Sequence, residues 1–322
     1  EGEEAMHVIK GVGAVIEAIV GLLGFRPVES LVLVGLQGNV AGAVLRMDLA
    51  DAAQDGGADE LADLAARSGA DGAVAVFVSA ESVHCALCAE EFREQARVLG
   101  AAVERRGVRL LAAAVVDSVE AGGRWHCADG CGVCGVLDDP TASPVAAAAV
   151  MAGQRQYGSR EELVGSVAAD AARVAALAPV LAGAGGNVED VAAAVREAVA
   201  VVRRVGEGAV LSDAELAGVG AVLVDLRVRD ALFTLVEADE AAAAEILWAQ
   251  LCRVLPQPFR AEALVLAAWA SYYTGAGPLA GVCLDAALAE VPGHRMARML
   301  DEALRAGIRP EALRALIANV PP

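Results

Sequence analysis

The stretch that decides the fold of the first half reads Ser30-Leu-Val-Leu-Val-Gly-Leu36, followed by the turn Gln37-Gly-Asn39 and the segment Val40–Leu49. The first run is rich in Val and Leu, a composition that favours a buried strand. In the second segment, polar residues such as Arg46 and Asp48 alternate with apolar ones, which indicates a half-buried strand. A short Gly-Asn turn between two such runs is typical of a β-hairpin.

Outward from this hairpin, helical and strand-like segments alternate. We expect helices over Gly13–Leu23, Asp59–Ser68 and Ala86–Arg106, and strands over Gly72–Ser79, Val108–Asp117 and Arg124–Cys127. Neighbouring parallel strands must be joined by a crossover, which is usually a helix. The order ββαβαββ therefore predicts an α/β fold for residues 1–140, a mixed sheet with flanking helices that ends in a Cys-rich loop.

The second half, residues 141–322, reads as an all-helical domain. Ser212 and Glu215 form a capping box at the start of a helix that we expect over Asp213–Val236. Further helices are expected near Glu240–Val254, Ala261–Thr274, Pro278–Glu290, Arg295–Ala306 and Pro310–Ala318. A tetratricopeptide-like helical hairpin is indicated by small and apolar residues at that repeat's spacing, namely Leu264, Ala268, Ala280, Leu284, Ala287 and Pro292.

Five of the seven cysteines fall in two tight groups, Cys85-x2-Cys88 and Cys127-x3-Cys131-x2-Cys134. Structural zinc sites use four N or S ligands in a tetrahedron, often as close pairs that the fold brings together. The first group follows a predicted strand and the second follows the last predicted strand, so the two loops can meet at one end of the sheet. A four-ligand set drawn from these five thiols and the imidazoles of His84 and His126 is therefore feasible, and we name all five thiols as candidate zinc ligands. Plain helix packing of Cys85 and Cys88, redox-labile thiols and a reversible disulfide remain open alternatives.

The three thiols of the second group also have the spacing with which radical S-adenosylmethionine enzymes hold a [4Fe–4S] cluster. Those enzymes place the motif early in a repeated β/α barrel, whereas here it follows the last predicted strand. Val133 also stands where they have an aromatic residue. An iron–sulfur cluster is therefore a weaker expectation than zinc. A thiolate nucleophile with His84 as its base is a further alternative, for which no orienting third residue is visible.

Composition excludes several classes of function. The net charge is −18 and no basic stripe with interleaved aromatics is present, so we expect no nucleic-acid binding. No secretory signal and no long charge-free apolar run are visible, so we expect no membrane span. An odd number of cysteines in an acidic, Ala-rich chain suits a reducing compartment. These observations favour a cytoplasmic protein.

Several phrases in a fixed order carry a family resemblance. They are Gly24–Val32, Cys127 in a loop after a Trp, Ser143–Ala148, Ser159–Leu163, Val228–Ala231, Leu266–Trp269, Gly275–Gly277 and Asp285–Leu288. In this order the chain resembles the actinobacterial proteins grouped as domain of unknown function 4192, from about Val12 to Pro310. The resemblance implies a cytoplasmic actinobacterial protein and carries no activity. Members often have a Cys and then two adjacent Cys and a Pro in the loop, whereas here Gly132 and Val133 separate Cys131 from Cys134.

Taken together, the sequence predicts a binding or assembly module whose Cys loop is metal-stabilised or redox-sensitive. Its expected partner is another protein or a second copy of the chain, since no complete catalytic set is visible. The alternative is a metal- or thiolate-dependent enzyme that uses Cys127, Cys131 and Cys134, with an unknown small-molecule substrate. The sequence leaves the question of enzymatic activity open.

Overall fold

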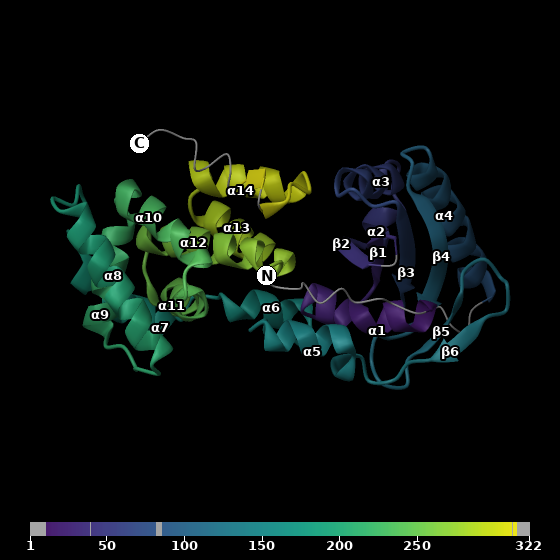
Figure 1. The fold of residues 1–322 in the computed structure, drawn as a ribbon, viewed down its shortest axis with the longest axis horizontal. Helices are drawn as coiled ribbons and strands as arrows, with labels where there is room; N and C mark the ends of the chain where they lie inside the picture. Colours follow the sequence, from purple (N-terminus) through teal and green to yellow (C-terminus); the bar gives the residue numbers. More distant parts are fainter. Residues whose placement is uncertain (1–10, 39, 82–85, 311, 314–322) are drawn as a thin grey trace. The chain divides into compact units, whose positions relative to one another are not determined.

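The computed structural model describes residues 11–38, 40–81, 86–310 and 312–313. The chain forms two compact units, one of residues 1–160 with 306–309 and one of residues 161–305 with 310–322. The division into two domains with a boundary after residue 140 stays a prediction. The two units are described in turn below, with the element labels of Figure 1.

The first unit is built on a mixed sheet, as the sequence predicts, and the sheet has six strands where the predicted order had five. Its elements are α1 (Val12–Leu23), β1 (Ser30–Gln37), β2 (Val40–Asp48), α2 (Leu49–Ala52), α3 (Gly57–Arg67), β3 (Gly72–Val78), α4 (Ala86–Glu104), β4 (Arg109–Val116), β5 (Arg124–Cys127), β6 (Cys134–Val136), η2 (Pro140–Ala142) and α5 (Pro144–Met151). The strand order is β2-β1-β3-β4-β5-β6, and only β3 and β4 run parallel. The parallel strands β3 and β4 are connected by α4. The antiparallel pairs at the two ends of the sheet, β1–β2 and β5–β6, are each connected by a short turn.

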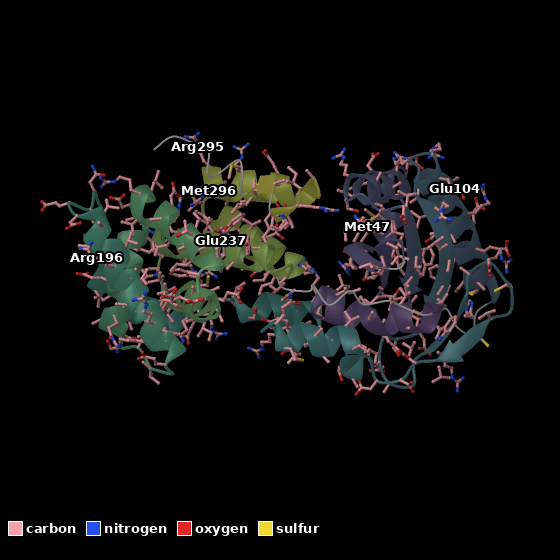
Figure 2. All side chains as sticks on the ribbon, viewed as in Figure 1. Met47, Glu104, Arg196, Glu237, Arg295 and Met296 are labelled. Atoms are coloured by element: carbon pink, nitrogen blue, oxygen red, sulfur yellow. The ribbon has the colours of Figure 1, made fainter. Side chains whose placement is uncertain are left out.

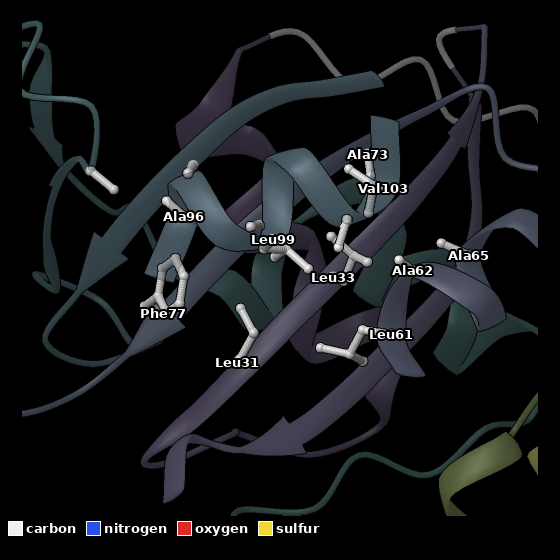
Figure 3. Close-up of a cluster of buried hydrophobic side chains, with 14 of the residues drawn as sticks. Leu31, Leu33, Leu61, Ala62, Ala65, Ala73, Phe77, Ala96, Leu99 and Val103 are labelled. Carbon is white, nitrogen blue, oxygen red and sulfur yellow. The ribbon is translucent and has the colours of Figure 1, made fainter. Parts of the chain in front are cut away.

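The core of this unit lies between the sheet and the helices α3 and α4. Residues Leu31, Leu33 and Phe77 of β1 and β3 point toward Leu61 of α3 and Leu99 of α4, and all five are buried (Figure 3). Since β1 and β3 are buried along nearly their whole length, they are covered on both faces. The second face is covered by α1, which contacts β3 and packs against α5. The sheet is therefore the middle layer of three.

The second unit is all-helical. Its elements are α6 (Arg160–Ser166), α7 (Ala171–Leu181), α8 (Val191–Gly206), α9 (Asp213–Leu223), α10 (Leu226–Leu232), η3 (Phe233–Glu237), α11 (Ala241–Val254), α12 (Phe259–Tyr273), α13 (Gly277–Glu290) and α14 (Arg295–Arg305) (Figure 1). The capping box at the start of α9 is confirmed, because Ser212 and Glu215 exchange both hydrogen bonds. The predicted helix over Pro310–Ala318 falls largely outside the described residues.

The prediction of one helix over Asp213–Val236 is wrong. The chain breaks after α9, restarts as α10 and tightens into the 3₁₀ turn η3. The break is held by Asp225, whose carboxylate accepts hydrogen bonds from the backbone N–H groups of Arg227 and of Val188, 37 residues earlier. Because that second partner is distant in sequence, the local pattern carried no sign of the break.

Five of the six tetratricopeptide-like residues lie in α12 and α13, which pack against each other, and the sixth, Pro292, follows α13 and is exposed. Leu264, Ala268, Ala280, Leu284 and Ala287 are all buried there. Their burial fits any tightly packed pair of helices, so the repeat-like character of the hairpin stays a prediction.

Among the described residues, one stretch, Arg160–Leu181, is apolar and long enough by composition to cross a membrane. A single stretch of this kind is weak evidence for a span, since core helices pass the same test. It is also interrupted: α6 ends at Ser166, and Asp170 caps a new helix by accepting hydrogen bonds from the N–H groups of Ala172 and Arg173. The stretch is therefore two short helices joined by a turn.

Candidate functional site

The second cysteine group lies at the tip of a β-hairpin formed by β5 and β6. His126 is paired with Cys134 in the register of the two strands, and the N–H of Cys127 donates to the carbonyl of Val133 at 2.9 Å. The tip is fastened to the sheet by Ala128, which is buried and whose N–H donates to the carbonyl of Ala113 in β4 at 2.8 Å. The loop therefore starts from a fixed point in the core.

Within this tip, the side chains of Cys127, Asp129 and Cys131 converge. One ligand atom from each lies within 4.8 Å of the other two, in the part of the chain that the structure describes. The backbone contributes to this arrangement, since Asp129 Oδ1 accepts a hydrogen bond from the N–H of Cys131 at 2.9 Å. Gly130, between them, has φ of +76°, a left-handed conformation that glycine adopts without strain. The loop thus folds back on itself and brings its two sulfurs together.

The pKa values of Cys127 and Asp129 are shifted in opposite directions. The Cys127 thiol is half-buried, and this burial together with the neighbouring Cys131 raises its pKa to about 11. Asp129 has its pKa lowered by hydrogen bonds from Cys131, and the nearby Arg93 of α4 acts in the same direction. At neutral pH the site holds a protonated thiol beside a carboxylate, so Cys127 is no ready thiolate nucleophile.

Cys134 stands apart from this group. Successive side chains of a strand point to opposite faces, and residues paired across two strands share a face. Because Cys134 is paired with His126, its side chain lies on the hairpin face opposite to that of Cys127. It is exposed and does not belong to the converging set. The hairpin register explains this separation, and the three-residue strand β6 that creates it gave no signal in the sequence.

The first cysteine group is only partly described. Cys85 and His84 lie outside the described residues. Cys88 lies in the first turn of α4, is half-buried and packs against the hydrophobic core that also contains Ala128. This placement fits the packing alternative for Cys88, and it does not bring Cys88 into the converging set.

Asp129 is the site residue that the sequence reasoning missed. Its signal was present, since a carboxylate two residues before Cys131 in a Gly-rich loop is a third potential zinc ligand. The structure thus presents a two-thiol, one-carboxylate set, whereas the sequence pointed to thiols alone. The metal role of the five cysteines itself stays a prediction.

The surrounding fold bears on the iron–sulfur alternative. The hairpin belongs to a six-stranded mixed sheet with antiparallel pairs at both ends. This differs from the repeated β/α barrel in which a three-cysteine cluster motif is expected. The iron–sulfur alternative therefore stays a weaker prediction than zinc.

Comparison with known proteins gives one match. Residues 13–311 match the family described as Domain of unknown function (DUF4192), which covers nearly the whole chain. No curated protein and no solved structure matches the chain.

Proposed function

The chain belongs to this DUF4192 family, and we propose that it is a cytoplasmic binding or assembly module whose hairpin tip binds zinc through Cys127, Asp129 and Cys131. The observation that supports the proposal is the convergence of these three ligand atoms to within 4.8 Å of one another. Thiolate sulfur and carboxylate oxygen are both common zinc ligands. Binding would displace the thiol protons and fix the loop in the shape it already has.

Zinc would leave one coordination position open at this site. Three protein ligands and one open position, which a water or a group from a partner can fill, are typical of catalytic zinc rather than of closed structural sites. This observation favours a metal-dependent enzyme as the second candidate function. His126 lies in the same hairpin, where its Nδ1 is 3.1 Å from the carbonyl oxygen of Cys127. Its register partner is Cys134, so its side chain lies on the face opposite to that of Cys127. The binding module therefore remains the first candidate.

The proposal places the protein in a reducing compartment and gives it a protein partner or a second copy of itself. None of the six described cysteines takes part in a disulfide. Several large apolar side chains are exposed on the helical unit, including Val180, Val210 and Leu226. Such side chains are available for a contact with another chain.

The decisive experiment is a metal titration of the whole protein under anaerobic, reducing conditions. Co²⁺ serves as the spectroscopic probe, because a Co–thiolate bond gives an intense near-ultraviolet absorption, and Zn²⁺ then displaces it. We expect one equivalent of Co²⁺ to bind and to give the Co–thiolate absorption band. Cys131→Ser should abolish that band. Asp129→Asn should weaken metal binding but keep the band.

Cys134→Ser is the matched control, because it removes an exposed thiol from the other face of the same hairpin. It should bind metal as the unchanged protein does. If the unchanged protein binds no metal, or if Cys134→Ser loses binding as completely as Cys131→Ser, the three-ligand assignment is wrong. A mass loss of two hydrogens on mild oxidation, reversed by reductant and absent in Cys131→Ser, would instead identify a disulfide between Cys127 and Cys131.

A further inference from the structure

The helical unit contains a cavity that is unrelated to the cysteine loop. Its volume is 740 Å³, within the range of roughly 300–1,000 Å³ in which small-molecule sites fall. Three segments line it: residues 178–187 at the end of α7, residues 224–227 between α9 and α10, and residues 256–259 before α12. All of them lie within one compact unit.

One wall is a glycine-rich loop, Gly183-Ala-Gly-Gly186, that offers unused hydrogen-bond donors. Among the described residues, the backbone N–H groups of Gly183, Gly185 and Gly186 donate to no protein acceptor. Each of these glycines has a positive φ, between +84° and +146°. A backbone without side chains lets a ligand come close to the N–H groups.

The loop is held in place by contact with the apolar floor. A Cβ atom added to Gly185 would lie 3.3 Å from Val224 and 3.7 Å from the ring of Phe259, so the backbone there packs directly on both side chains. Phe259 is buried, and with Leu181 and Val224 it gives the cavity an apolar floor. Packing at Gly185 therefore restrains the middle of the loop before any ligand arrives, which lowers the entropic cost of binding.

The two charged side chains that line the cavity are Asp225 and Arg227, and only Arg227 has hydrogen-bonding capacity left for a ligand. The carboxylate of Asp225 accepts four hydrogen bonds, from the Nε, Nη2 and backbone N–H of Arg227 and from the N–H of Val188. Its oxygens are thus fully used. Arg227 keeps Nη1 without a protein partner in the described part of the chain, and more than half of its side chain is exposed.

From this geometry we infer that the cavity binds a small organic carboxylate, with its anionic group at the Gly183–Gly186 loop and Arg227 and its short apolar body against Leu181, Val224 and Phe259. The glycine loop and Arg227 both line the cavity and supply backbone and guanidinium donors, and the apolar side chains line its floor. A carboxylate accepts several such bonds at once, and charge-assisted bonds of this kind are the stronger ones.

The inference is tested by titrating hexanoate into the whole protein labelled with ¹⁵N-glycine and following the amide signals of Gly183, Gly185 and Gly186. Hexanoate should shift these signals to saturation. Acetate, which has the charge without the apolar body, and 1-hexanol, which has the body without the charge, should each bind at least about tenfold more weakly. If hexanol binds as well as hexanoate, or if no glycine signal saturates with hexanoate, the inference fails.

Two variants locate the site. Arg227→Gln should weaken hexanoate binding by about tenfold to a hundredfold, the range expected for a bond to a charged donor. Its matched control, Arg196→Gln, removes the same charge from the exposed side of α8 and should leave binding unchanged (Figure 2). Ala178→Phe fills the cavity from an exposed position on its wall and leaves Arg227 in place, so it should abolish binding even if Arg227→Gln disturbs the fold. Equal binding by Arg227→Gln and Arg196→Gln, or unchanged binding by Ala178→Phe, would overturn the assignment.

Discussion

The described polar side chains that are buried in the sheet-containing unit are three serines, Ser30, Ser79 and Ser143, whereas those in the helical unit include four ionisable residues, Asp225, Arg229, Arg260 and His294. A sheet satisfies its backbone N–H and C=O groups within its own ladder, so its core needs no charged partner. Each helix end, by contrast, leaves several backbone groups without an intrahelical partner. Short, broken helices multiply these ends.

The buried Arg260 of the helical unit serves those ends. Arg260 donates from Nε to the carbonyl of Cys252 near the end of α11 at 2.5 Å, and from Nη2 to the carbonyl of Val167 after α6 at 2.7 Å. Its third nitrogen pairs with Glu290 at the end of α13. One side chain thus ties three helix ends together.

Asp225 and His294 likewise accept hydrogen bonds from backbone N–H groups at helix starts. Arg229 instead pairs with the carboxylates of Asp230 and Glu262. Three of the four buried ionisable residues of this unit thus bond backbone groups at helix ends.

The largest effect that tests this comparison comes from Arg260→Met. The change leaves Glu290 without its cation and two buried carbonyls without donors, so we expect a loss of about 3–5 kcal/mol in the free energy of unfolding. Denaturant unfolding measures it. Arg253→Met is the matched control, since Arg253 is an exposed residue near the end of α11. If both variants lose the same small amount, buried charge does not hold the helix ends and the comparison fails.

The apolar core of the first unit provides the second test. Leu99 of α4 is buried and faces Leu33 of β1, and it belongs to the same core cluster as Ala96 and Val103 (Figure 3). Leu99→Ala should destabilise the protein by about 3 kcal/mol through lost transfer energy and the cavity left behind. Val98→Ala, one position along the same helix and partly exposed, should cost well under half as much. Comparable losses in the two variants would show that this face of α4 is not the core that the comparison requires.

These two regions also show how far the sequence alone reaches. The strands β1 to β4 were predictable because each carries an apolar or alternating run of ordinary strand length. The short strand β5 was predicted from the Gly122-Gly123 turn that precedes it. The strand β6, only Cys134–Val136, has no such run and is created by pairing with β5. Its absence from the prediction also hid the fact that Cys134 and Cys127 face opposite sides of the hairpin.

In the helical unit, the helices were predictable where a cap or a tight turn marks their ends in the local sequence. The capping box at Ser212 is one example. The break at Asp225 was not predictable, because its partner Val188 lies far away in the chain. The same long-range contact builds one wall of the cavity, so the cavity could not be found from local patterns either.

The smallest effect concerns a surface charge at the start of α9. The carboxylate of Glu215 accepts hydrogen bonds from the hydroxyl of Ser212 at 2.6 Å and from its N–H at 2.8 Å, and it pairs with Arg204. These contacts, with the Ser212 hydroxyl first, lower the pKa of Glu215 from 4.5 to about 2. A lowered folded-state pKa means that the contribution is fully present above pH 4.5 and is lost as the pH falls toward 2.

Measuring the free energy of unfolding between pH 6 and pH 2.5 therefore tests whether an exposed carboxylate at a helix start also contributes to stability. The free energy of unfolding of Glu215→Gln should fall less steeply with acid than that of the unchanged protein. The difference between the two proteins should be small at low pH, increase with pH, and become constant above pH 4.5. Glu207→Gln, an exposed carboxylate just after α8, should run parallel to the unchanged protein. If the Glu215 and Glu207 variants give the same curve, the Glu215 carboxylate is only a solvated surface charge, and the comparison then depends on the buried groups, such as Arg260 and Asp225.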